Sequence, residues 1–354
     1  MTALALGLLL AAVWLAVWSY LLYPPWIRLL AARRPARPRP AEQLPSVEVL
    51  LAAADEEAVI GDRVGNLLAQ EYPGACSISI GCDGCKDRTA ERARASLGQS
   101  GRVIEFPERR GKASVLNDLV AAARADVLVF TDANTRFDPG AVGRLAQALA
   151  DPRVGAACGR LILEAPGAMA TPESVFWERE TRSKEAEGRL GVCLGANGAI
   201  YAARRASVES LPSDTAMDDF LIPARIAGRG QEVVFVSEAV ARERLPGDVR
   251  AEISRRFRIG VGAGQVLRRE RWLWSFRRRP LLAFVFFSRK AARWLAPVAA
   301  ILAAAAAAGS PALRPAGLVA LGLGALLALS LRGRAPVSGA VARLYYFAVI
   351  NLAL

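Results

Sequence analysis

The residues best suited to chemistry follow a short apolar run in the middle of the chain. Val127–Phe130 reads as a buried strand and ends at Thr131-Asp132-Ala133-Asn134. In open α/β sheets, ligands bind at the carboxyl ends of the strands. A carboxylate two residues from an amide oxygen suits a hard divalent cation such as Mg²⁺ or Mn²⁺, which prefers oxygen ligands. The alternative is that Asp132 only caps a helix that starts near Pro139.

Acidic residues also follow the two preceding strand-like runs. Asp55-Glu56-Glu57 comes after Val47–Ala53, and Asp83 and Asp87 come after Cys76–Cys82. Three acidic clusters along one sheet edge repel each other, so a bound cation or a donor-rich ligand must offset that cost. A nucleotide sugar with its metal ion supplies both, because the metal bridges a carboxylate and the diphosphate.

Two further positions could act on such a ligand. The chain has no histidine and only four lysines. Lys112 starts a predicted helix, whose N-terminal N–H groups favour anions, so it is either a nucleotide contact or a solvated side chain. Asp218-Asp219 heads a later helix, where the helix dipole stabilises carboxylates. Without histidine, one of these aspartates is the natural general base for a hydroxyl acceptor.

The order of apolar runs predicts how these residues are positioned. From residue 47, strand and helix patterns alternate four times, which is typical of a parallel sheet with helices on both faces. The predicted strands are 47–53, 76–82, 102–106, 127–131, 154–163, 197–203 and 233–236. The predicted helices are 57–70, 87–97, 112–124, 139–149, 171–187 and 218–227, and a basic segment follows from 252 to 267.

The two ends of the chain predict a membrane protein. Residues 3–22 are uncharged and long enough to cross about 30 Å of hydrocarbon as a helix. Three more apolar segments, 294–309, 315–331 and 336–354, are candidate spans. Basic clusters follow the first span and precede the second, and such clusters stay on the cytoplasmic side. We therefore expect a multi-pass protein of a bacterial-type inner membrane, with its polar middle in the cytoplasm.

Composition excludes several other classes of function. The net charge of +13 lies largely in the clusters beside the spans, where it meets anionic headgroups, and no nucleic-acid motif is present. Cys82 and Cys85 have C-x-x-C spacing, but zinc would need further thiolates or histidines. We therefore expect neither nucleic-acid binding nor a zinc site.

Several motifs together resemble those of the inverting, membrane-embedded family-2 glycosyltransferases, the group of hyaluronan, poly-N-acetylglucosamine and cellulose synthases. The motifs, in order, are AAADEE, CDGCKDRT, GKASVLN, TDANT, MDDF and RRFRIG, and the resemblance covers residues 47–265. It implies a GT-A type α/β domain with a Rossmann-like mixed sheet. The expected domains are 1–25 (membrane helix), 26–46 (basic linker), 47–245 (catalytic domain), 246–290 (interfacial segment) and 291–354 (membrane helices).

The resemblance assigns the donor and metal contacts. Glu56, Asp83 and Lys112 would hold the nucleotide of a donor, expected to be a UDP-sugar. Asp132 would coordinate Mg²⁺ or Mn²⁺ on the diphosphate. Asn134 stands where the family has a second acid, so a metal site of Asp132 and Asn134 carries one carboxylate fewer.

The resemblance also assigns the groups at the acceptor side. Asp219 would be the general base of an inverting transfer, with Asp218 beside it. Arg255 and Arg258 would face the diphosphate or the acceptor. Arg255 replaces the family's glutamine, and Ile259 replaces its tryptophan, which holds the acceptor in processive synthases.

Three functions stay open at this point. The first is transfer of one sugar to a lipid, lipid-linked or saccharide acceptor at the cytoplasmic membrane face. The second is a processive exopolysaccharide synthase that needs partner subunits. The third is a non-catalytic membrane scaffold that only binds the nucleotide.

Overall fold

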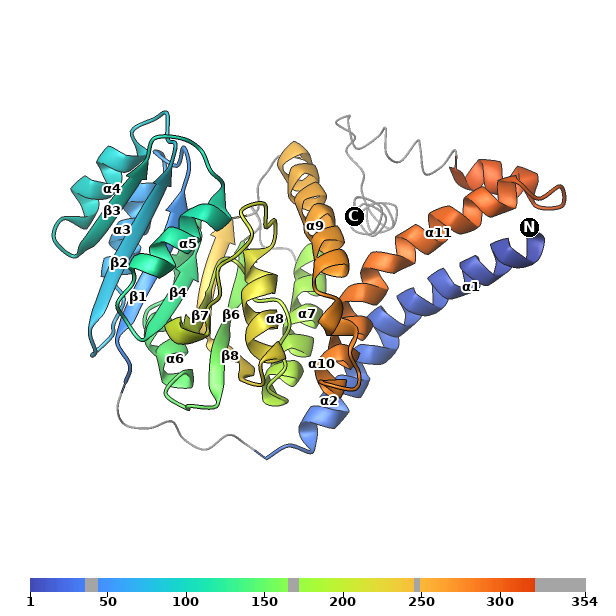
Figure 1. Ribbon diagram of the computed structural model, residues 1–354, viewed down its shortest axis with the longest axis horizontal. Coiled ribbons are helices and arrows are strands. Elements are labelled where there is room, and N and C mark those ends of the chain that lie inside the picture. The colour runs from blue at the N-terminus through green and yellow to red at the C-terminus, as the bar shows by residue number, and fades with distance from the viewer. Residues whose placement is uncertain (36–43, 165–171, 245–248, 322–354) are drawn as a thin grey trace. The chain divides into compact units, whose positions relative to one another are not determined.

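The computed structural model describes residues 1–35, 44–164, 172–244 and 249–321 (Figure 1). The chain forms two compact units. The sheet unit comprises Arg28–Met169 and Trp177–Leu245, and the helical unit comprises Met1–Ile27, Ala170–Phe176 and Pro246–Leu354. Each unit is described by itself below.

The sheet unit is built on one mixed sheet of eight strands in the order β3-β2-β1-β4-β7-β6-β8-β5. Neighbours pair in parallel from β3 to β4 and between β6 and β8, whereas β7 runs antiparallel to both β4 and β6. The strands are β1 (Val47–Ala53), β2 (Cys76–Asp83), β3 (Gly101–Phe106), β4 (Val127–Thr131), β5 (Thr135–Phe137), β6 (Val154–Glu164), β7 (Tyr201–Arg204) and β8 (Glu232–Arg244).

Helices connect most of the successive strands and cover the sheet (Figure 1). They are α3 (Ile60–Leu68), α4 (Thr89–Leu97), α5 (Lys112–Ala122), α6 (Ala141–Ala148), α7 (Pro172–Arg189) and α8 (Asp218–Gly228). Helices α3, α4 and α6 share one apolar core with alternate residues of β1, Val47, Val49 and Leu51. Every residue of β4 is buried, as expected for a central strand covered on both faces.

Helix α5 packs so closely on β2 that the strand needs a glycine. A Cβ atom at Gly81 would lie 2.3 Å from Cγ1 of Val115 on α5. Side chains at that position would push α5 away from the sheet. Lys112 is the first residue of α5, one turn before Val115, so this close packing also fixes the backbone position of Lys112 relative to β2.

The predicted alternation of strands and helices is confirmed, with three differences. The run 197–203 does not form a strand throughout, because the Ile200 N–H donates to the Asn197 carbonyl at 2.9 Å and closes a tight turn before β7. The short strand β5 was not predicted, since Thr135–Phe137 is only three residues long and pairs with the distant Ala241–Glu243 of β8. Strand β8 also continues beyond Val236 to Arg244.

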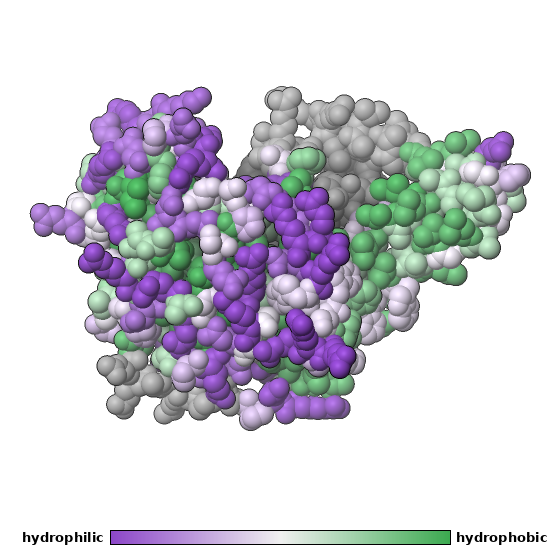
Figure 2. Space-filling model, viewed as in Figure 1, coloured by the Kyte–Doolittle hydropathy of each residue, from purple (hydrophilic) through white to green (hydrophobic). Residues whose placement is uncertain are grey.

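Two helices are long and apolar enough to cross a membrane, Thr2–Ala32 and Pro280–Ala308, and both lie in the helical unit except for the end of the first after Ile27. The first is made of α1 (Thr2–Val17), a π-helical turn (Trp18–Leu22) and α2 (Tyr23–Ala32). The second is made of α10 (Pro280–Val285), a π-helical turn (Phe286–Ala291) and α11 (Ala292–Ala308). Exposed apolar side chains give both a surface that is mostly green in Figure 2, whereas the sheet unit is mostly purple.

These two helices pack against each other. Trp18 meets Phe284 edge to face with ring centroids 6.1 Å apart, and Arg293 donates to the Ser19 carbonyl at 3.3 Å. The unit also contains α9 (Val249–Arg269) and a 3₁₀ turn at Arg271–Trp274. Of the predicted later spans, 315–331 continues past the described residues at 321, and 336–354 lies outside them.

Candidate active site

A lysine and two carboxylates meet at the carboxyl end of β4. Lys112 Nζ donates to Asp132 Oδ1 at 2.8 Å and lies 3.4 Å from Asp218 Oδ1. The three residues come from the start of α5, the end of β4 and the start of α8. The capping alternative for Asp132 is wrong, because α6 begins after Gly140 with no side-chain cap.

The surrounding carboxylates keep Lys112 charged. Burial by itself would lower the pKa of Lys112, but Asp132, Asp218 and Asp219 together outweigh burial and raise it above its ordinary value. The side chain is still 36% exposed, so a ligand can reach it. Lys112 is therefore a permanent cation at the centre of an acidic site, within reach of an anionic ligand.

Asp218 and Asp219 have different surroundings although they are adjacent. Asp218 is buried and accepts a hydrogen bond from the Tyr201 hydroxyl at 3.2 Å. The Tyr201 ring stacks on Phe130 with centroids 4.6 Å apart, so β4 and β7 hold this contact in place. Asp219 is only partly buried. Asp218 is thus anchored inside the protein, and Asp219 is the more accessible carboxylate.

Asp132 and Asp219 face a common point. A Cβ atom built on Gly198 would lie 3.4 Å from Asp132 Oδ2 and 3.7 Å from Asp219 Oδ2. Both oxygens therefore border one small volume at the end of β4. The prediction that a base and a metal-binding carboxylate share a site requires this proximity, while the roles of Asp219 and Asp132 stay predictions.

Asp83 holds the loop that leads to Lys112. It is buried, and its two carboxylate oxygens accept the N–H groups of Arg110 at 2.7 Å and Gly111 at 2.8 Å. The approach of the two loops requires a glycine at position 84, where φ is 54° and a Cβ atom would lie 2.4 Å from the Arg109 nitrogen. The predicted contact of Asp83 with the donor stays a prediction.

Glu56 lies in the same electrostatic field as the other strand-end acids. Burial raises the pKa of Glu56, and Asp132, Asp87 and Asp55 raise it further, in that order. Its side chain is partly buried at the end of β1. The crowding of acids predicted along the sheet edge is therefore present at Glu56.

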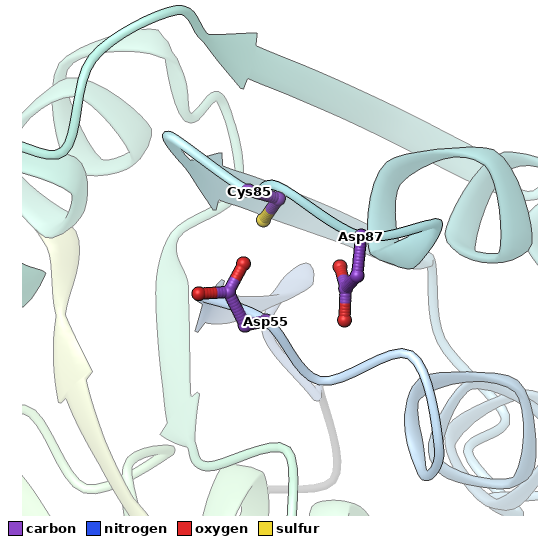
Figure 3. Close-up of side chains that lie close together, drawn as sticks. All are labelled: Asp55, Cys85 and Asp87. Atoms are coloured by element: carbon purple, nitrogen blue, oxygen red, sulfur yellow. The ribbon is translucent and has the colours of Figure 1, made fainter.

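Asp55, Cys85 and Asp87 form a second acidic cluster, shown in Figure 3, with ligand atoms within 4.8 Å of one another. The carboxylate oxygens of Asp55 and Asp87 accept hydrogen bonds from the protein. Asp55 accepts from the Lys86 N–H at 2.8 Å and from Arg109 at 2.6 Å. Asp87 accepts from the N–H groups of Thr89 and Glu57. We interpret the cluster as a brace between the β1 and β2 loops.

The remaining predicted site residues are Asn134, Arg255 and Arg258. Asn134 is exposed, and its Nδ2 donates to Glu243 Oε1 on β8 at 2.8 Å. Arg255 and Arg258 lie on α9, which belongs to the helical unit. Metal binding by Asn134 and diphosphate contact by the two arginines stay predictions.

Arg63 on α3 is a charged residue of the site that the sequence analysis did not identify. It is buried, donates to Thr131 Oγ1 at 2.6 Å and lies over the Phe137 ring at 4.3 Å. Burial lowers the pKa of Arg63 to about 9, against the opposite effect of Asp132. An arginine next to Val64, on the apolar side of an amphipathic helix, was the available signal.

The donor set fits a hard divalent cation. Asp132 offers a carboxylate oxygen, the ligand that Mg²⁺ and Mn²⁺ prefer, at the edge of the volume that it shares with Asp219.

Comparison with known proteins identifies the family of this chain. Residues 45–262 match the family described as "Glycosyltransferase like family 2", and the chain belongs to that family. The chain is 24% identical over 246 residues to an N-acetylglucosaminyltransferase of Rhizobium meliloti (strain 1021), covering 64% of this chain and 57% of that protein. It is 32% identical over 120 residues to a poly-beta-1,6-N-acetyl-D-glucosamine synthase of Staphylococcus aureus (strain COL), covering 33% of this chain and 29% of that protein.

A solved structure shares the fold. It is the mannosyltransferase PcManGT from Pyrobaculum calidifontis, in complex with GDP-Man and Mn²⁺, with a TM-score of 0.65 and 24% sequence identity. The likeness covers 97% of both chains. The GT-A type of fold expected from the sequence is thereby confirmed.

Proposed function

We propose that this protein transfers a sugar from a nucleotide-sugar donor to an acceptor hydroxyl, with inversion at the anomeric carbon. The observation that carries the proposal is the convergence of Lys112, Asp132 and Asp218, together with Asp219 at the same volume. Such a set offers a cation for a diphosphate and carboxylates for a metal and a proton. Membership of the glycosyltransferase family supports the same conclusion.

Asp219 acts as the general base in this proposal. The acceptor O–H gives its proton to the Asp219 carboxylate while its oxygen forms a bond to the anomeric carbon. The bond from that carbon to the diphosphate breaks, and its electron pair leaves with the nucleoside diphosphate. Asp218 is held by Tyr201 and orients the first turn of α8, which carries Asp219.

Asp132 would hold Mg²⁺ or Mn²⁺, a Lewis acid that stabilises the charge of the departing diphosphate. Lys112 would contact the same diphosphate, since it is charged, partly exposed and seated at the N-terminus of α5. Glu56 and Asp83 would face the nucleotide, and Arg255 and Arg258 would approach from α9.

A UDP-sugar is the proposed donor, supported by relatives named as N-acetylglucosaminyltransferases. The acceptor would be a lipid, lipid-linked or saccharide hydroxyl at the cytoplasmic face of the inner membrane. Two helices that are long and apolar enough to cross a membrane, and the basic clusters in the sequence beside them, support this placement. A processive synthase with partner subunits is the second candidate, supported by the poly-beta-1,6-N-acetyl-D-glucosamine synthase relative.

The test is release of nucleoside diphosphate from a panel of UDP- and GDP-sugars by the purified full chain supplied with membranes. We expect turnover of a UDP-sugar, loss of turnover on chelation, and recovery with Mn²⁺ or Mg²⁺. One added sugar per acceptor indicates single transfer, whereas a ladder of products indicates a processive synthase. Absence of turnover with every donor, at full metal loading, would leave only the scaffold function.

A further inference from the structure

The loop before β7 forms one side of the volume that Asp132 and Asp219 share. The Ala196 N–H donates to the Asp219 carbonyl at 2.9 Å, so the loop is tied to the first turn of α8. At Gly198, the three atoms nearest to an added Cβ would be Asp132 Oδ2, Asp219 Oδ2 and Asp219 Cβ. Because Gly198 has no side chain, the position that a Cβ atom would occupy is free and borders both carboxylates.

A glycine is not needed there for backbone reasons. Gly198 is not among the described glycines with positive φ, so its backbone is one that alanine adopts freely. An alanine methyl would make only ordinary van der Waals contacts of 3.4–3.8 Å. The position can thus hold a side chain without strain in the empty protein, and a requirement for glycine would come from a ligand.

A buried polar pair fixes the depth of this loop. Lys184 on α7 is 4% exposed and donates from Nζ to Asn197 Oδ1 at 2.6 Å. Asn197 is itself buried, and its Nδ2 donates to the Gly159 carbonyl on β6 at 3.0 Å. Burying an ammonium group costs free energy unless it makes strong hydrogen bonds. We interpret the buried Lys184 as a sign that the position of this loop matters for function.

We propose that Gly198 forms the seat on which the acceptor hydroxyl meets the anomeric carbon, and that Lys184 and Asn197 are positioning residues for that seat. The inference rests on the proposed function and assigns it a location. A hydroxyl over Gly198 lies within reach of Asp219 as base and beside Asp132. The Asn197 amide is hydrogen-bonded to Lys184 on α7 and to Gly159 on β6. These two bonds fix the position of the neighbouring Gly198 relative to the two carboxylates.

The first test is Gly198→Ala, with Gly143→Ala as its matched control. A Cβ atom at Gly143 would meet neighbours at 3.4 and 3.8 Å, nearly as at Gly198, but on α6 beside Glu71 and Tyr72. With UDP-N-acetylglucosamine and membranes, we expect Gly198→Ala to lower kcat by about tenfold or more, because small displacements of reacting atoms cost large factors in rate. The KM for donor and the Kd for UDP should stay within about twofold.

The second test is a double-mutant cycle with Lys184→Met and Asn197→Ala. If the pair acts as one unit, both single variants lower kcat by similar factors at unchanged donor KM, and the double variant is no worse than either. The inference is overturned if Gly198→Ala behaves like Gly143→Ala. It is also overturned if Lys184→Met and Asn197→Ala, folded by melting temperature, keep the wild-type kcat.

The two proposals fail in distinguishable ways. If the wild-type chain releases no nucleoside diphosphate from any donor, the proposed function fails, and the seat falls with it. If the wild-type chain turns over donor and Gly198→Ala does so equally fast, the transferase stands and only the seat is wrong.

Discussion

Asp83 holds the N–H of Gly111 at 2.8 Å, one residue before Lys112. The same carboxylate accepts the Arg110 N–H, so a buried acid at the end of β2 fixes the start of α5. The sequence analysis placed Asp83 at the nucleotide. In the structure, its two hydrogen bonds determine where the Lys112 side chain begins, and this role has consequences that can be measured.

Asp83→Asn is expected to weaken both folding and donor binding. An amide has one acceptor oxygen where the carboxylate has two, so one of the two backbone N–H groups is left unsatisfied. This costs about 1–3 kcal/mol in the free energy of unfolding. The donor KM should rise because Lys112 loses its fixed starting point. Thermal melts and initial rates check this, with the exposed Glu91→Gln as control; an unchanged melting temperature would contradict it.

Lys112→Met is expected to abolish most donor turnover and to leave the chain folded. The change removes the cation from between Asp132 and Asp218, so the diphosphate meets uncompensated carboxylates. Since the carboxylates raise the pKa of Lys112 above 10.5, the wild-type ion pairs persist through the neutral range and are lost only as the pH rises beyond that value. Rates measured across neutral pH should therefore show no step caused by Lys112, and Lys112→Arg should recover part of the donor affinity.

Asp219→Asn is expected to stop sugar transfer while donor binding stays. An amide cannot accept the acceptor proton, and removal of a general base lowers rates by about 10²–10⁴. Equilibrium binding of UDP and the rate of UDP release should be measured on the same preparation. Asp62→Asn, at an exposed position on α3, is the control. Transfer by Asp219→Asn at the wild-type rate would remove Asp219 from the mechanism.

The strand ends were predictable from sequence, whereas the contacts around them were not. Asp132 could be placed because β4 is a continuous apolar run that ends at Thr131, and a buried strand of this kind has few alternatives. The partners of Asp83 depend on the φ of 54° at Gly84 and on a loop 27 residues further along the chain, which no local pattern encodes. Asn197 was placed in a strand because apolar residues follow it, although its turn is set by Lys184 and Gly159, each far away in sequence.

Arg63→Met is expected to stabilise the protein at neutral pH, and the gain should shrink as the pH rises. Burial lowers the pKa of Arg63 to about 9, below its ordinary value of 12.5, so the unfolded chain binds this proton more tightly than the folded one. Wild-type stability relative to Arg63→Met therefore increases between those two values.

The hydrogen-bond partners of Arg63 stay satisfied in Arg63→Met, because Thr131 Oγ1 still donates to the Ala199 carbonyl and Asn66 Oδ1 still accepts from the Phe137 N–H. Melting temperatures of both proteins from neutral pH to about pH 10 check the trend, with the exposed Arg94→Met as control, for which the difference from wild type should not change in this way. A difference that stays constant with pH would show that the charge of Arg63 is not disfavoured by its burial.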